Sequence, residues 1–267
     1  MPYINNRGVK IHYEVEGEGI PLVLQHGSSG NLGNWRSFGY VEALKNEYKL
    51  ILIDARGHGE SDKPHDPDAY STEAFEGDFT AILDELCIKK AHYWGYSMGG
   101  RIGFRVIGRY LLSRFYSMVL GGASPYPINT DSEKKELSDR LTALRVAVDK
   151  GVDAYLASLE AKSGPLSPRA KERIIASDPI AIYNLTKTTY DWPSAEDVLP
   201  KINIPCFIYA SDADPRYSGA REGAAHIPNA KFLSFQGIEH IEILRRSELV
   251  LPHVKNFLAE VNKTITV

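Results

Sequence analysis

Residues 92–100 read HYWGYSMGG and place one serine, Ser97, inside the pattern Gly-x-Ser-x-Gly. An apolar, strand-like run leads into this serine and a helix-like run follows it. In a sharp strand–turn–helix connection the serine takes strained backbone angles, and its hydroxyl projects from the end of the strand. Glycines are required beside it because a side chain there would collide with neighbouring backbone. The stretch predicts a nucleophilic hydroxyl on Ser97; the alternative is a buried, hydrogen-bonded serine in a glycine-rich turn.

The sequence around this serine alternates between strand-like and helix-like segments. Amphipathic segments such as 72–86 and 101–115 lie between short runs that are almost continuously apolar, as strands buried on both faces of a parallel sheet are. These runs are PLVLQ (21–25), KLILID (49–54), AHYWGY (91–96), YSMVLGG (116–122), CFIYAS (206–211) and AKFLSF (230–235). The alternation predicts an α/β fold with a mostly parallel sheet and helices on both faces.

The two ends of the predicted sheet differ from its centre. Residues 9–16 alternate apolar and polar side chains, which is typical of a half-exposed strand with His12 pointing outward. The stretch Asn6-Arg7-Gly8 before it suggests a hairpin with an N-terminal partner strand. With the six apolar runs, these two strands bring the expected sheet to eight strands.

One long segment contains no strand-like run. Residues 124–193 consist of helical stretches separated by prolines. A helical cap inserted after the sixth strand is the natural interpretation. We therefore expect a core made of residues 1–123 and 194–267 and a cap or lid made of residues 124–193.

Composition limits the classes of partner. The 267 residues include 31 Lys and Arg against 34 Asp and Glu, a net charge of -3, so no strong positive field favours nucleic acid or an anionic membrane. No apolar run approaches the roughly 20 residues that cross a bilayer, and the N-terminus lacks the apolar stretch of a secretory signal. We expect a cytoplasmic protein with reduced Cys87 and Cys206, a small-molecule substrate, no cofactor and no metal; the oligomeric state stays open.

A serine hydroxyl needs a base and an orienting carboxylate, which in this type of fold follow the serine in the order acid, then histidine. Of the eight histidines, His240 follows the last predicted strand and its short loop 236–239, at the sheet edge where reaction sites collect, whereas His253 lies farther along in a helical or loop segment without glycines. The acid is expected after the preceding strand, where Asp212 and Asp214 both qualify. The residues themselves leave this choice open, and either aspartate could instead cap a turn.

Charge that develops on a substrate carbonyl oxygen requires fixed N–H donors. One donor is expected from Met98, the residue after the serine. The second is expected from the loop after residues 21–25, at Ser28 with Ser29 as the alternative. In this loop His26 is expected to hold the backbone in place, since it precedes the serine in the chain.

Taken together, these motifs resemble the α/β-hydrolase fold family, most closely its small serine esterase and lactonase branch. The similar stretches cover almost all of the core: His26-Gly27, Asp54 to Ser61 (DARGHGES), Gly95 to Gly100, Asp214-Pro215 and Gly237 to His240. The resemblance favours Asp214 as the acid, because the family's aspartate directly precedes the proline-type position. It also implies that DARGHGES is a structural turn.

The resemblance further implies a carboxylesterase-like hydrolase that cleaves esters or lactones through an acyl-enzyme on Ser97. Dehalogenases and epoxide hydrolases of this fold use an aspartate nucleophile, so the serine argues against both. Two alternatives stay open: a carbon–carbon bond hydrolase, although those often have Trp where Ile241 stands, and a ligand receptor with vestigial hydrolysis. Perhydrolase-like members tend to have proline near the oxyanion loop, which Ser28-Ser29 lacks.

Aromatic residues are expected to line an apolar substrate pocket for a small or medium uncharged acyl group. The candidates are Trp35, Tyr96, Tyr126 and Trp192. The lysines and arginines of residues 124–193 are spaced like those of a solvated helix face.

Overall fold

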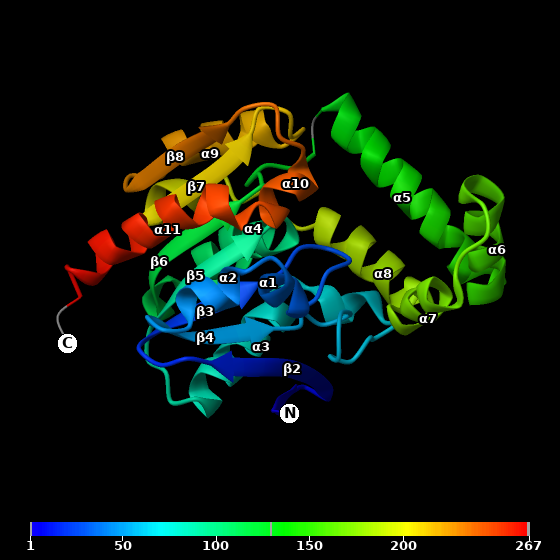
Figure 1. Cartoon of the computed structure of the whole chain (residues 1–267), viewed down its shortest axis with the longest axis horizontal. Helices are drawn as coiled ribbons and strands as arrows, with labels where there is room; N and C mark the ends of the chain where they lie inside the picture. Colours follow the sequence, from blue (N-terminus) through cyan, green and yellow to red (C-terminus); the bar gives the residue numbers. More distant parts are fainter. Residues whose placement is uncertain (1, 129, 266–267) are drawn as a thin grey trace.

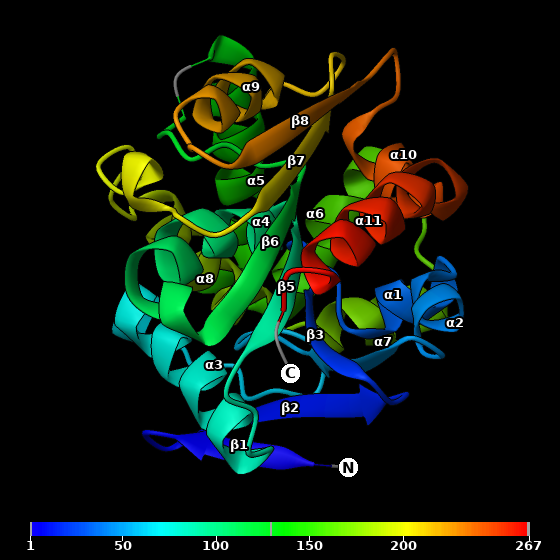
Figure 2. The same cartoon turned by 90° about the vertical axis from the view of Figure 1, so that its left-hand side faces the viewer.

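The computed structural model describes residues 2–128 and 130–265, and it contains one eight-stranded sheet (Figure 1). The order of strands across the sheet is β1-β2-β4-β3-β5-β6-β7-β8, with β8 at one edge and β1 at the other (Figure 2). The strands are β1 (Tyr3–Asn6), β2 (Val9–Glu16), β3 (Ile20–Gln25), β4 (Tyr48–Ile53), β5 (Ala91–Tyr96), β6 (Phe115–Gly121), β7 (Cys206–Ser211) and β8 (Ala230–Phe235).

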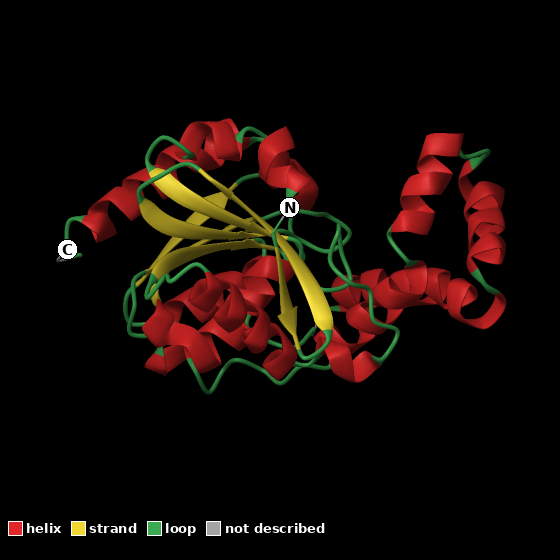
Figure 3. Ribbon diagram, turned by 90° about the horizontal axis from the view of Figure 1, so that it is seen from below, coloured by secondary structure: helices red, strands yellow, loops and turns green. Residues whose placement is uncertain are grey.

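Strands β3 to β8 are mutually parallel, whereas β1 and β2 pair antiparallel at the N-terminal edge. The apolar runs fall on the parallel strands because helices cover both faces of this part of the sheet (Figure 3). The predicted fold class, a mostly parallel eight-stranded sheet with a helical cap after the sixth strand, is confirmed. Its main consequence is that the carboxyl ends of β3 to β8 meet at one edge.

The helices of the core form two layers. Helices α3, α4 and α9 pack with the π-helical segment η2 on one face, and α1, α2, α10 and α11 pack on the other. Their bounds are α1 (Gly33–Ser37), α2 (Tyr40–Leu44), η1 (Pro67–Tyr70), α3 (Thr72–Glu85), α4 (Met98–Ile102), η2 (Gly103–Leu111), η3 (Leu112–Arg114), η4 (Leu199–Lys201), α9 (Tyr217–Ala225), α10 (His240–Arg245) and α11 (Ser247–Asn262). No helix in the described ranges is both long and apolar enough to cross a membrane.

Four helices between β6 and β7 extend to one side of the core (Figure 1). They are α5 (Asp131–Lys150), α6 (Val152–Ser163), α7 (Pro168–Ala176) and α8 (Pro179–Tyr190). Helix α5 begins with a capping box between Thr130 and Glu133, and α8 packs against η1 of the core. The four helices lie within the proposed cap, whose exact bounds stay a prediction.

The expectation for His12 is wrong. This side chain is 2% exposed, although the alternation along β2 placed it on the outer face. Its ring lies 5.1 Å from the ring of Tyr3, and Nδ1 lies 2.8 Å from a carboxylate oxygen of Asp54. The neighbouring strand β1 and the turn after β4 cover this face, so a polar position in the sequence pattern became a buried one.

Candidate functional site

Ser97 occupies a strained turn between β5 and α4. Its φ of 55° lies in the left-handed region, and its ψ is -109°. A Cβ on Gly95 would stand 2.3 Å from the carbonyl oxygen of Gly99, and a Cβ on Gly99 would stand 2.3 Å from that of Gln25. Such backbone strain costs on the order of 1–3 kcal/mol and persists only where the surrounding structure enforces it. The two glycines are therefore what allows the turn to close.

Three side chains from distant parts of the sequence meet at the carboxyl edge of the sheet. His240 Nε2 lies 2.9 Å from Ser97 Oγ, and His240 Nδ1 lies 2.5 Å from Asp214 Oδ2. The serine follows β5, the aspartate follows β7 and the histidine follows β8. Because these strands are parallel, their ends share one edge, and a continuous line of hydrogen bonds joins hydroxyl, imidazole and carboxylate.

The two candidate acids have different surroundings. Asp212 Oδ1 accepts the backbone N–H of Gly237 at 2.7 Å, which fixes the loop before His240. Asp214 has a side chain only 1% exposed, and its Oδ1 accepts the backbone N–H of Arg216 at 3.0 Å. Of the two aspartates, the structure places Asp214 against the imidazole.

The carboxylate of Asp214 is buried but charged. Burial alone would raise its pKa, yet the hydrogen bond and charge of His240 and the backbone and guanidinium of Arg216 hold the pKa below its ordinary value. An ionised Asp214 keeps a proton on His240 Nδ1 and leaves Nε2 free to accept one from Ser97.

The imidazole is seated by two groups beside it. The hydroxyl of Tyr96 donates to the backbone carbonyl of His240, and the two rings lie 5.2 Å apart. Gly122 has a φ of 57°, and a Cβ there would stand 2.9 Å from His240 Cε1. Tyr96, expected in the substrate pocket, is 1% exposed and instead holds the histidine loop.

The loop after β3 lies against the serine, since a Cβ on Gly27 would stand 3.2 Å from Ser97 Cβ. The N–H of Ser29 donates to His58 Nε2 at 3.2 Å, so it is occupied. In the described part of the chain, no protein acceptor takes the N–H of Ser28 or Met98. These two groups are thus available as oxyanion donors, and Ser29 is the weaker alternative.

His26 fixes the same loop. Its Nε2 accepts the N–H of Ala55 at 3.1 Å, and its Nδ1 donates to the carbonyl of Gly27 at 2.8 Å. Burial lowers the pKa of His26. Burial, and to a smaller extent the neighbouring His26, lowers the pKa of His58 well below its usual range. Both rings are therefore neutral, as their acceptor roles require.

Two of the aromatic candidates are packed into the core. Trp35 is 1% exposed, and its ring lies 5.1 Å from that of Tyr40. Trp192 packs 5.2 Å from the ring of Phe75 and donates its N–H to a backbone carbonyl of the core. The expectation that these indoles line a pocket finds no support in their placement, because packing already occupies both rings.

Tyr126 lies at the edge of the core, where its hydroxyl is 3.1 Å from Nδ1 of the exposed His226. Like Trp35, Tyr96 and Trp192, it is absent from the walls of the large cavity beside the serine loop. The side chains of Ser97 and His240 are also absent from these walls, so the pocket role expected for Tyr126 stays a prediction.

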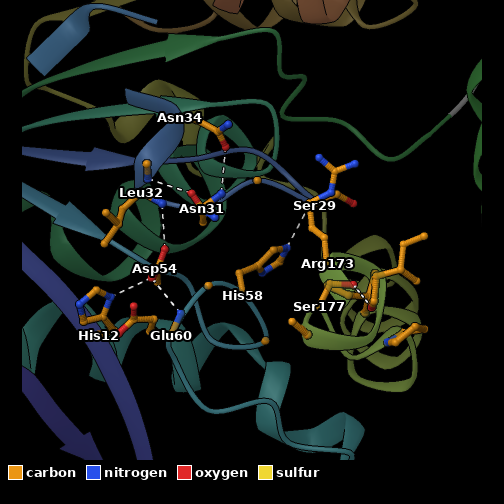
Figure 4. Close-up of a pocket in the computed structure, with 18 of the residues that line it drawn as sticks. His12, Ser29, Asn31, Leu32, Asn34, Asp54, His58, Glu60, Arg173 and Ser177 are labelled. Atoms are coloured by element: carbon orange, nitrogen blue, oxygen red, sulfur yellow. Dashed lines mark hydrogen bonds and ion pairs between the residues drawn. The ribbon is translucent and has the colours of Figure 1, made fainter. Parts of the chain in front are cut away.

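A cavity of about 1160 Å³ lies between the cap and the core loops. Figure 4 shows Ser29 and His58 near its centre, with the His12–Asp54 pair on one side and Arg173 on the other. The walls include many polar and charged side chains, and Ser97, Asp214 and His240 are not among them, so the apolar substrate pocket that the sequence suggested stays a prediction. No group of three or more His, Cys, Asp or Glu side chains suited to a metal ion occurs in residues 2–128 and 130–265.

Two arginines connect the cap and core, and the sequence analysis did not single them out. Arg140 of α5 donates to Ser29 Oγ at 2.9 Å, and Arg216 donates to both oxygens of Glu136, also of α5, at 3.0 Å. The position of Arg216, two residues after Asp214, could have pointed to it. Arg140 has no such signal, and it is not part of a solvated helix face.

Comparisons with known proteins identify the fold family of the chain. A family model described as alpha/beta hydrolase fold matches residues 20–164, more than half of the chain. The chain is 26% identical to 3-oxoadipate enol-lactonase 1 of Acinetobacter baylyi, covering 79% of this chain and 78% of the relative. It is also 26% identical to a non-heme chloroperoxidase of Streptomyces lividans, covering 94% and 96%. A solved carboxylesterase of Nitrososphaera gargenis superposes with a TM-score of 0.80 at 21% identity, covering 99% and 100%.

Proposed function

The chain belongs to the α/β-hydrolase fold family, and we propose that it is a serine hydrolase that cleaves carboxylic esters or lactones. The observation that carries this proposal is the line of hydrogen bonds from Ser97 through His240 to Asp214. A nucleophile, a base and an orienting acid are the components that acyl transfer to water requires.

In the proposed mechanism, Ser97 Oγ attacks the substrate carbonyl while His240 Nε2 accepts its proton. Asp214 stabilises the resulting imidazolium, and the backbone N–H groups of Met98 and Ser28 bind the tetrahedral oxyanion. His240 then gives its proton to the leaving alcohol, which leaves an acyl-enzyme. A water molecule attacks this ester with His240 as base, releasing the acid and restoring Ser97. Each oxyanion donor would contribute about 2.7–4 kcal/mol to transition-state stabilisation.

The names of similar proteins support an ester or lactone bond as the target, since they include an enol-lactonase and a carboxylesterase. A carbon–carbon bond hydrolase with the same triad is the second candidate, and a ligand receptor with slow hydrolysis is the third. We also propose a cytoplasmic location, supported by the two free thiols of Cys87 and Cys206, and the division into core and cap at residues 124–193.

A fluorophosphonate probe tests the nucleophile directly, because it forms a covalent adduct with an activated serine. Intact mass spectrometry is expected to show one adduct on the wild type and none on Ser97→Ala. Ser113→Ala is the matched control, because Ser113 is exposed and precedes β6 at the opposite edge of the sheet. It should label like the wild type.

A substrate panel then separates the candidate functions. The wild type is expected to hydrolyse short aryl esters and lactones faster than a vinylogous diketone, and Ser97→Ala is expected to lose several orders of magnitude of activity. Faster cleavage of the diketone would favour the carbon–carbon hydrolase. Hydrolysis that Ser97→Ala retains would refute the proposed mechanism.

A further inference from the structure

Arg140 carries a positive charge into the cavity beside the oxyanion loop. Its guanidinium donates to Ser29 Oγ at 2.9 Å and helps to line the cavity. No carboxylate of residues 2–128 or 130–265 lies within ion-pair distance of it, and the same holds for Arg169 and Arg173, which also line the cavity, whereas eight other arginines have such a partner. Burial lowers the pKa of Arg140, although Tyr190 and the carboxylate of Glu136 act in the opposite direction.

Arg105 shows how this protein accommodates a buried arginine that has only a structural role. That side chain is 2% exposed. Among the described residues, no carboxylate lies within ion-pair distance of it either. It donates to three backbone carbonyls, those of Ser124, Tyr126 and Pro193, at 2.9–3.1 Å. Arg140 donates to a single hydroxyl among the described residues. Arg140 is half-buried, and a guanidinium has five N–H donors, so most of them stay available for an anion that the chain does not supply.

Two more arginines, Arg101 and Arg216, lie near the same site. Arg101 lies one helical turn after Ser97, half-buried, with its guanidinium 4.0 Å from the ring of Tyr190 and a hydrogen bond to a backbone carbonyl. Burial and the charge of Arg216 lower the pKa of Arg101. The charge of Arg216 also lowers the pKa of Arg140, and the carboxylate of the cap that pairs with Arg216 is that of Glu136. Arg216 is paired with both Asp214 and Glu136, so of these three guanidiniums only those of Arg101 and Arg140 have no carboxylate within ion-pair distance among the described residues.

The acidic side chains at the far side of the cavity are already engaged. The oxygens of Asp54 accept hydrogen bonds from His12 and from the backbone N–H groups of Leu32 and Glu60. Glu14 forms an ion pair with Arg36 on the core. None of these carboxylates neutralises Arg140, so the two walls of the cavity differ in charge.

We propose that Arg140 binds a carboxylate of the substrate, so that this enzyme prefers esters or lactones with a negatively charged group near the scissile bond. Ser29, which Arg140 contacts, directly follows Ser28, a proposed oxyanion donor. A substrate could therefore place its carboxylate on the Arg140 guanidinium and its scissile carbonyl at Ser97, with a short carbon chain between the two groups. The inference rests on the proposed hydrolase function and replaces the uncharged acyl group expected from the sequence.

Two matched substrate pairs test the preference. In one pair the charge is on the acyl side, with mono-p-nitrophenyl glutarate against p-nitrophenyl butyrate. In the other it is on the alcohol side, with the butyrate ester of glycolate against ethyl butyrate. We expect kcat/KM to be at least about tenfold higher for the charged member of one pair, the effect of a charge-assisted hydrogen bond. Equal or lower values for the charged members of both pairs would overturn the proposal.

Substitutions on α5 identify the residue responsible. Arg140→Gln is expected to reduce the charged-to-neutral ratio of kcat/KM by about 10- to 150-fold. Arg140→Lys should retain part of the ratio, since the charge stays and the planar fork is lost. Arg145→Gln is the matched control, because Arg145 is on the same helix but pairs with Asp149 in solvent; its ratio should equal that of the wild type. A ratio that Arg140→Gln leaves unchanged would overturn the assignment.

The uncharged fluorophosphonate probe keeps the two proposals apart. If Ser97 is not labelled in the wild type, the hydrolase function itself fails. If Ser97 is labelled but neither charged substrate is preferred, only the inference about Arg140 fails. The substrate pairs measured on the wild type require no variant, so poor folding of Arg140→Gln would not leave the proposal untested.

Discussion

Replacing Asp214 by asparagine keeps the shape of the side chain. It is expected to move the proton of the His240 imidazole from Nδ1 to Nε2. The backbone N–H and a guanidinium N–H of Arg216 donate to Oδ1 of Asp214 at 3.0 and 3.3 Å. These donors would hold the asparagine oxygen at the Oδ1 position. The amide nitrogen then takes the Oδ2 position, which is 2.5 Å from His240 Nδ1. By donating to Nδ1, it forces the imidazole proton onto Nε2, where the ring can no longer accept a proton from Ser97.

The expected loss follows from this change of tautomer. In other serine triads an aspartate-to-asparagine change with intact geometry lowers kcat by about 10⁴-fold, which corresponds to about 5.4 kcal/mol at 1.36 kcal/mol per tenfold. The full effect is expected because the side chain of Asp214 is 1% exposed, so that solvent has little access to replace the carboxylate. Hydrolysis of p-nitrophenyl butyrate at neutral pH and the rate of fluorophosphonate labelling measure the loss, with thermal unfolding as a check on the fold.

Asp212→Asn is the matched control for this experiment. Its oxygen accepts the N–H of Gly237 at 2.7 Å, and asparagine retains an acceptor for it. We expect kcat to change by about twofold at most, as for an exposed substitution. The reasoning would be refuted if Asp214→Asn kept activity within about tenfold of the wild type, or if both variants lost activity equally.

Three further predictions concern stability. Gly95→Ala places a Cβ 2.3 Å from a backbone oxygen and should cost about 3 kcal/mol or more in urea unfolding; wild-type stability would contradict the account of the turn. Burial lowers the pKa of His92 to about 4 from 6.5, so the unfolded state binds more protons in that window. Unfolding free energy should therefore fall by up to about 3 kcal/mol from His92 as pH drops through it, a slope that His92→Gln should flatten in pH-dependent melts. Arg56→Gln removes the 2.6 Å ion pair with the buried Asp78. It should lower the free energy of unfolding, measured in urea, by about 3–5 kcal/mol; a loss under about 1 kcal/mol would show that the pair is dispensable.

The sequence by itself determined the features whose signals are local. The apolar runs of β3 to β8 and the glycines around Ser97 depend on hydrogen bonding and steric limits within a few residues. Chain order and strand ends then indicated His240 and two possible acids, because parallel strands bring their carboxyl ends to one edge. Family resemblance, rather than any local pattern, favoured Asp214 over Asp212.

Only the tertiary structure decided which side chains face the cavity. Arg140 contacts Ser29 across 111 positions of sequence, and no periodicity within α5 distinguishes it from the exposed Arg145. His12 became buried because the neighbouring strand and the turn after β4 cover it, and Trp35 packs into the core instead of facing a substrate. Burial and charge pairing depend on what other segments bring alongside a residue, so they are properties of the folded chain and not of its local pattern.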